Sequence, residues 1–257
     1  MSFHTKRSGR ADEVLELFDI AGLKVKMNCK DGLLYERSRA YLSDGQDEKE
    51  DFSLELDDDR LTRLNDNVPS LTRDECYYVY MGEGFYRRLL DFDGLLLHSS
   101  CIEKDGEAYL FSARSGTGKS THTHLWMQTF GDVRMINDDK PAVRKIGDRF
   151  YACGTPFSGK NDESSNVCVP IRAIVFLQRA KENRIERLDP AAAIPLFLSQ
   201  TIRPSTEEYM TKALSLLDGI LKSVPVFMLY CNISEQAVHT AYDGINKYLN
   251  EVKENEN

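Results

Sequence analysis

A glycine-rich run near the middle of the chain contains the residue types that bind phosphate. It lies between residues 107–111, an apolar run typical of a strand, and residues 121–130, which have the pattern of a helix. Glycines let several backbone N–H groups turn toward one anion, and the helix that follows adds partial positive charge. The residues predicted to bind a nucleotide are Ser115, Gly116, Thr117, Gly118, Lys119, Ser120 and Thr121.

Two side chains of this run have a predicted role in chemistry. Lys119 is expected to reach the β- and γ-phosphates, and the hydroxyl of Ser120 is expected to bind Mg²⁺. The first position of the phosphate-loop pattern is Ala113 instead of glycine, which the backbone tolerates only if φ is negative there. A glycine-rich turn without a ligand is the alternative. We favour a site for ATP and Mg²⁺.

Two adjacent carboxylates follow the next predicted strand, residues 133–137. Asp138 and Asp139 stand at its end. In phosphoryl-transfer enzymes one such aspartate holds Mg²⁺, and a second can accept the proton of an attacking hydroxyl. The sequence leaves open which aspartate has which role; we favour Asp138 as the base and Asp139, with Ser120, as the metal ligand. A surface Asp-Asp turn is the alternative in a chain with 41 acidic residues.

Together the two motifs resemble the HPr kinase/phosphorylase and ATP-dependent phosphoenolpyruvate carboxykinase superfamily. There too a phosphate loop, here residues 115–121, is followed by an Asp-Asp motif, here within residues 136–139. The resemblance covers residues 92–257 and implies an α/β, P-loop-containing core. It also implies a role for His98, because HPr kinases have a histidine in a similar place near the transferred phosphate. A core histidine at a strand end is the alternative.

The segment from Gly154 to Lys160 resembles shorter HPr-kinase-related proteins of uncertain substrate. If this loop folds over the nucleotide, Lys160 can stabilise charge on the transferring phosphoryl group. A solvated lysine in a polar hairpin is the alternative. The chain lacks the Arg-Gly-rich signature of HPr kinases after the acidic pair and is far shorter than a carboxykinase. A diverged kinase relative is therefore expected.

Composition narrows the classes of partner. The chain has 257 residues and a net charge of −8, which argues against nucleic acid and anionic membranes. No apolar run approaches the length of a membrane span, and residues 1–10 lack the apolar stretch of a signal peptide. Six cysteines without a Cys-x-x-Cys spacing are predicted to be reduced thiols in the cytoplasm.

We expect two regions. Residues 1–91 are predicted to form a smaller α+β N-terminal region, with strands near 23–29, 52–56 and 76–80 and a short helix at 84–91. Residues 92–257 are predicted to form the kinase core. Its further elements are a buried strand at 172–177, a helix that begins at Asp189-Pro190, a helix after Ser205, a strand at 225–231 and a final amphipathic helix. This alternation predicts an α/β fold.

The predicted function is ATP- and Mg²⁺-dependent transfer of the γ-phosphoryl group to a hydroxyl of a small molecule or of a peptide or protein serine. A nucleotide-dependent peptide- or protein-binding module without phosphoryl transfer is a second hypothesis, because the catalytic parts leave the N-terminal region unexplained. A true HPr kinase/phosphorylase is a third. The acceptor, the nucleotide base and the oligomeric state stay open, and an oligomer is compatible with the sequence.

Overall fold

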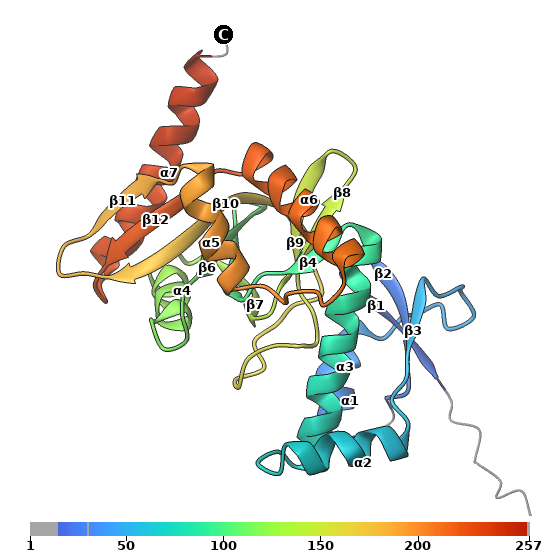
Figure 1. Cartoon of the computed structure of the whole chain (residues 1–257). Coiled ribbons are helices and arrows are strands. Elements are labelled where there is room, and N and C mark those ends of the chain that lie inside the picture. The colour runs from blue at the N-terminus through green and yellow to red at the C-terminus, as the bar shows by residue number, and fades with distance from the viewer. Residues whose placement is uncertain (1–14, 30, 256–257) are drawn as a thin grey trace, which may run out of the picture.

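The computed structural model describes residues 15–29 and 31–255, and the segment 1–10, predicted not to be a signal peptide, lies outside them. The described chain has a mixed α/β fold with two sheets (Figure 1). The strands are β1 (Glu16–Ile20), β2 (Leu23–Met27), β3 (Phe52–Leu54), β4 (Gly94–Leu96), β5 (Ser99–Lys104), β6 (Glu107–Ser112), β7 (Arg134–Asp139), β8 (Ala142–Ile146), β9 (Arg149–Cys153), β10 (Cys168–Arg179), β11 (Arg184–Arg187) and β12 (Val226–Cys231). The α-helices are α1 (Gly32–Ser38), α2 (Asp58–Asn67), α3 (Arg73–Leu89), α4 (Lys119–Thr129), α5 (Pro190–Ser199), α6 (Glu207–Ser223) and α7 (Glu235–Asn255).

The larger sheet has the order β4-β8-β9-β10-β6-β5-β7; β12 joins it through β10, and β11 pairs with β12. The long strand β10 connects its two parts. The first residues of β10 pair with β9 in antiparallel fashion, and its later residues pair with β6 and β12 in parallel fashion. The register shifts between Ile171 and Ala173, as at a β-bulge, where a sheet can bend. The apolar run predicted as a buried strand is the second part of β10.

Strand register brings the ends of β6 and β7 to one edge of this sheet. Ser99 of β5 lies opposite Ser112 of β6 on one side and opposite Asp139 of β7 on the other. The glycine-rich loop begins directly after Ser112, and the acidic pair ends β7. Because β5 separates the two strands by a single strand width, about 5 Å on each side, the loop and the carboxylates are neighbours in space.

Helix α3 corrects the prediction for residues 76–80. These residues, three of them tyrosine, were expected in a strand, yet they belong to a helix from Arg73 to Leu89. The helix predicted at 84–91 is confirmed as the second half of α3, which continues into a 3₁₀ turn at Leu90–Phe92. A capping box between Thr72 and Glu75 starts this helix, and its buried residues recur every three or four positions along one face. Packing of that face overrides the strand propensity of individual residues.

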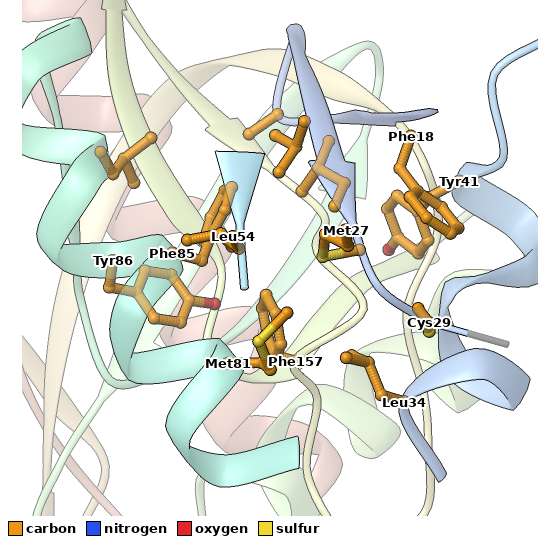
Figure 2. Close-up of a cluster of buried hydrophobic side chains, with 14 of the residues drawn as sticks. Phe18, Met27, Cys29, Leu34, Tyr41, Leu54, Met81, Phe85, Tyr86 and Phe157 are labelled. Atoms are coloured by element: carbon orange, nitrogen blue, oxygen red, sulfur yellow. The ribbon is translucent and has the colours of Figure 1, made fainter. Parts of the chain in front are cut away.

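The N-terminal sheet and α3 enclose one hydrophobic cluster that also takes a residue from a distant loop. Phe157 is fully buried and lies among Met81, Phe85 and Tyr86 of α3 (Figure 2). A Cβ on Gly82 would come within 2.9 Å of the Phe157 ring, so this close approach requires glycine. The loop that carries Phe157, residues 154–167, is thereby anchored to α3.

A disulfide overturns the prediction that all six cysteines are reduced. Cys153 and Cys168 lie opposite each other in the antiparallel pair of β9 and β10, with their Cα atoms 4.1 Å apart, and form a disulfide. Fifteen positions separate them in sequence, so no local spacing reveals the pairing. The bond closes the base of the loop 154–167. Cys29, Cys76, Cys101 and Cys231 are free thiols.

Among the described residues, no helix is both long enough and apolar enough to span a bilayer.

Candidate functional site

The loop between β6 and α4, residues 113–118, is the first part of the candidate site. Gly116 and Gly118 have φ angles of 75° and 117°, which glycine adopts without a steric penalty. A Cβ on either glycine would meet no atom within 4 Å, so backbone conformation rather than crowding requires glycine here. Ala113 is not among the described residues with positive φ, as expected for a residue that replaces glycine at the first position.

The start of α4 offers backbone donors to this loop. Gly118 is its N-cap and provides no capping side chain. The first intrahelical bond runs from the N–H group of His122 to the Gly118 carbonyl, at 2.9 Å. The helix therefore provides no acceptor for the N–H groups of residues 119–121. Such donors, together with the helix dipole, favour an anion at this point.

Lys119 connects the loop to the acidic pair. Its Nζ donates a hydrogen bond to the Ala113 carbonyl, at 3.3 Å, so the side chain folds back along the loop. Burial lowers the pKa of Lys119, and the charges of Asp139 and Asp138 act in the opposite direction. The lysine and both carboxylates therefore belong to one electrostatic environment.

Asp138 is buried, with 7% of its surface exposed, and its backbone is bonded on both sides to the loop 154–167. Its N–H group donates to the Glu163 carbonyl at 2.9 Å, and its carbonyl accepts from the Gly159 N–H group at 2.7 Å. Because these two hydrogen bonds fix the backbone of Asp138, they also limit the positions that its carboxylate can take. Among the described residues, no ion pair engages the Asp138 side chain.

Asp139 is held by two neighbours. His98 Nε2 lies 2.5 Å from its Oδ1, and Lys140 Nζ lies 2.9 Å from its Oδ2. Burial raises the pKa of Asp139, but the hydrogen bond with His98 and the charge of Lys140 outweigh it and hold the pKa well below its usual value. The backbone of Asp139 has a φ of 134°, in a region that residues other than glycine rarely adopt; such strained residues cluster at functional sites.

His98 is fixed from three directions. The ring atom Nδ1 lies 3.2 Å from Gln200 Oε1, and the backbone N–H group of His98 donates to the backbone carbonyl of Gln200 at 2.7 Å. The hydroxyl of Ser112, at the start of the glycine-rich loop, donates to the His98 carbonyl at 2.8 Å. His98 therefore links Asp139, the glycine-rich loop and the segment after α5.

The structure places Lys160 at the surface of the loop 154–167. Its side chain is exposed, and no hydrogen bond or ion pair joins it to another described residue. The loop itself is well anchored: Tyr86 bonds the Lys140 carbonyl and the Thr155 hydroxyl, and Tyr78 bonds the carbonyl of Ser158. The structure brings Lys119, Asp138, Asp139 and His98 together and leaves Lys160 on an adjacent loop.

Three residues near the site were not predicted from the sequence. Lys140 follows Asp139 directly, so the run Asp-Asp-Lys was a usable local signal. Gln200 contacts His98 from 102 positions away. Arg179, at the end of β10, donates to the carbonyls of Thr117 at 3.0 Å and Gly116 at 2.5 Å. No sequence pattern indicated Gln200 or Arg179, because their contacts depend on the sheet order.

Two hollows flank the glycine-rich loop. One of about 770 Å³ is lined by Ser115, Gly116, Arg179, Ser199 and Gln200 among others. The other, of about 270 Å³, is more apolar and includes residues from the start of α4 and from the end of β12, namely Thr121, His122, Leu125 and Cys231. The loop thus has room for a bound molecule on both sides.

The donor set at this edge fits a Mg²⁺ ion better than a transition metal. Within the described residues no group of three or more His, Cys, Asp and Glu side chains could hold a metal ion. Mg²⁺ needs no such cage, because it is usually held by one or two carboxylates together with waters and substrate phosphates. Ser120, at the start of α4, and the two aspartates are of the required type.

The fold is therefore mixed α/β, with a glycine-rich loop, a lysine, a histidine and two aspartates at one sheet edge. The model of the family described as SynChlorMet cassette protein ScmC matches residues 76–239, and the chain belongs to this family. The HPr(Ser) kinase/phosphatase from Coxiella burnetii is a similar solved structure, with 14% sequence identity and a TM-score of 0.35 over 61% of this chain and 97% of that chain. No curated protein matches the sequence.

Proposed function

We propose that this protein is an ATP- and Mg²⁺-dependent kinase that transfers the γ-phosphoryl group to a hydroxyl. The observation that carries the proposal is the position of Asp138 and Asp139 one strand away from the glycine-rich loop, in the same electrostatic environment as Lys119. Phosphoryl transfer needs mainly positioning and charge compensation. A cation, a phosphate-binding loop and two carboxylates supply both.

Each residue has a stated role in this proposal. The N–H groups of residues 115–121 and the side chain of Lys119 bind the phosphates. Ser120 and Asp139 would hold Mg²⁺, which would compensate the negative charge of the phosphates. Asp138 accepts the proton of the acceptor hydroxyl. The hydroxyl oxygen then forms a bond to the γ-phosphorus as the bond to the bridging oxygen breaks, and ADP leaves.

The division between the two aspartates follows from their neighbours. No described residue forms an ion pair with Asp138, so its carboxylate is available to accept a proton. Asp139 is kept ionised by His98 and Lys140, and an ionised carboxylate is what a metal ion requires. A carboxylate accepts several contacts at once, so a metal ion can share Asp139 with His98.

Lys160 and His98 complete the proposed machinery. Lys160 is exposed on a loop whose backbone is bonded to Asp138, and in this proposal its charge compensates that of the transferring phosphoryl group. His98 acts mainly through Asp139, which it orients.

The test follows label from γ-labelled ATP in the presence of Mg²⁺. The acceptor panel contains free serine, common polyols, serine-containing peptides and HPr. Label is expected on one acceptor class with the wild-type protein, and Lys119→Ala is expected to reduce transfer at least 100-fold, as for the loss of a phosphate-binding charge. Lys247→Ala, an exposed lysine of α7, is the matched control. Equal transfer by Lys119→Ala and wild type would overturn the proposal.

A nucleotide-dependent binding module is the second candidate. It is favoured by the N-terminal region, which packs around Phe157 of the loop 154–167, while none of its described side chains contacts the acidic pair. This candidate predicts tight binding of ATP with little turnover on any acceptor.

A further inference from the structure

The N-terminal sheet ends in a strand that is unpaired on one side. Its order is β1-β2-β3, so β3 has β2 on one side and no strand on the other among the described residues. Phe52, Leu54 and Leu56 are buried, while Ser53 and Glu55 between them are exposed, so the extended conformation continues past β3. An open strand edge has backbone N–H and C=O groups that can pair with another extended segment.

A groove runs along this edge. It has a volume of about 480 Å³ and lies between β3 and its extension, the start of α2 and one side of α3. Figure 2 shows Leu54 of β3 beside Phe85 of α3. We call it the docking groove; its residues are 53–56, 60, 80, 81, 83, 84, 87 and 88. A Cβ added to Gly84 of α3, at the floor of the groove, would lie 3.4 Å from the Leu54 side chain, so β3 lies close to α3.

The docking groove contains more arginines than carboxylates although the chain is acidic. Arg60, Arg87 and Arg88 line it against Glu55 and Glu83, an excess of one positive charge, in a protein with a net charge of −8. Arg87 pairs with Glu83 at 2.6 Å and Arg88 with Asp91 at 2.9 Å; exposed pairs of this kind are weak and exchange readily for another carboxylate. Arg60 has no ion-pair partner within the described chain. Guanidinium groups beside an open strand edge favour an acidic partner.

The groove continues toward the candidate site. Arg87 and Arg88 also line a second hollow, of about 190 Å³, whose far wall is formed by residues 201–206. That segment, which crosses from α5 to α6 (Figure 1), follows directly after Gln200, the partner of His98. Gln200 in turn lines the hollow beside the glycine-rich loop. The docking groove and the second hollow share Arg87 and Arg88, and a segment bound there would take the path along residues 201–206 and Gln200 to reach the loop.

We propose that the docking groove binds an acidic peptide segment in extended conformation, as an added strand on β3. The remainder of the peptide follows the path past Arg87 and Arg88, and its serine or threonine hydroxyl is the phosphoryl acceptor. The inference rests on the proposed kinase function and names its substrate class. Docking at a distance raises the effective concentration of the hydroxyl at the site without a new contact to the reacting groups.

Binding is tested on the full chain with fluorescein-labelled peptides of alternating glutamate and valine, followed by anisotropy. The control peptide has lysine at every glutamate position. The acidic peptide is expected to bind at least tenfold more tightly than the basic one, and Arg60→Glu and Arg87→Glu are each expected to weaken it about tenfold. Arg63→Glu, exposed on the same helix α2 but outside the groove, changes the net charge equally and is expected to leave binding unchanged. Equal weakening by all three variants would overturn the proposal.

Strand addition has a second signature that charge alone does not produce. An added strand directs every other N–H group toward β3. Methylating the backbone nitrogens of one alternate set of peptide residues is therefore expected to abolish binding, and methylating the other set is expected to leave it intact. Equal effects of the two sets would overturn strand addition. Dimerisation of the protein that the peptide does not displace would instead assign the β3 edge to a second copy of the chain.

The outcome separates this proposal from the kinase function. Binding is measured without ATP and with Lys119→Ala, so it does not depend on turnover. Peptide binding without phosphoryl transfer to a serine-containing version of the peptide would overturn the kinase and the acceptor assignment. Transfer to a small polyol, with no peptide binding, would support the kinase and overturn the docking groove.

Discussion

His98 Nε2 lies 2.5 Å from Oδ1 of Asp139, and the two residues come from the loop before β5 and from the end of β7. This hydrogen bond, together with the charge of Lys140, keeps the pKa of Asp139 low in spite of its burial. An aspartate with a lowered pKa stays ionised at neutral pH, and its stabilising contacts are lost only when the pH falls through that lowered value. His98 therefore positions the carboxylate and keeps it charged.

Replacing His98 is expected to move the acid limb of activity. In His98→Ala the pKa of Asp139 rises because burial is less well compensated, so activity falls at a higher pH than in the wild type. The affinity for Mg²⁺ or the activity should decrease roughly 10- to 100-fold, as for other residues that orient a metal ligand. The pH profile and a Mg²⁺ titration measure both effects. His98→Gln, which keeps a donor, should recover part of the loss; a pH profile unchanged in His98→Ala would contradict the assignment.

Gly159→Ala is expected to disturb Asp138 more than any other residue of the site. A Cβ at Gly159 would come within 2.6 Å of the Asp138 carbonyl, so the backbone hydrogen bond between them must lengthen. A displaced base lowers kcat, by roughly 10- to 100-fold for a shift near 1 Å. Steady-state kinetics and a melting curve test this. Gly131→Ala, where a Cβ meets no atom within 4 Å, is the control; equal kcat values for the two variants would show that Asp138 is not the base.

His122 makes the fold sensitive to acid. It is buried, its Nε2 accepts a hydrogen bond from Trp126 Nε1 at 3.0 Å, and burial lowers its pKa to about 4. Because the unfolded chain binds the proton more tightly, stability is complete above the unfolded value of about 6.5 and is lost as the pH falls toward 4. The full effect is about 3 kcal/mol.

Denaturant unfolding between pH 7 and pH 4 measures this loss. His122→Gln keeps an acceptor for Trp126 and cannot be protonated in this range, so its stability should change less with pH than that of the wild type. A parallel pH dependence of the two proteins would assign the acid sensitivity to other groups.

The disulfide between Cys153 and Cys168 is expected to stabilise the loop 154–167. It closes a loop of about fifteen residues, for which the loss of chain entropy in the unfolded state corresponds to about 3 kcal/mol. The double variant Cys153→Ser, Cys168→Ser should unfold at lower denaturant concentration than the wild type, and a reductant should affect only the wild type. Cys231→Ser, a free and partly exposed thiol, is the control for cysteine replacement as such.

Local structure was largely predictable because its causes are local. The glycine-rich run between an apolar strand and a helix could be read directly, since glycine, strand and helix signals act within a few residues. The start of α5 at Asp189 and Pro190 was predicted for the same reason: the aspartate caps the first turn and proline suits it. The carboxylate pair at the end of β7 was also visible in sequence.

Long-range structure needed the fold. Residues 76–80 have strand propensity, yet the face they present to the N-terminal sheet and to Phe157 makes them part of α3. The partnership of Cys153 with Cys168 depends on antiparallel pairing across a loop. The contacts of His98 with Asp139 and Gln200 require residues that are 41 and 102 positions apart to meet.

The sequence by itself determined which residue types are present for phosphate, metal and proton chemistry, because these motifs are encoded by neighbours along the chain. Only the tertiary structure decided how they face each other. The order β6-β5-β7 brings the loop and the carboxylates to one edge, and the free edge of β3 beside α3 creates the docking groove. Strand order and open edges result from packing of the whole chain, and no local pattern specifies them.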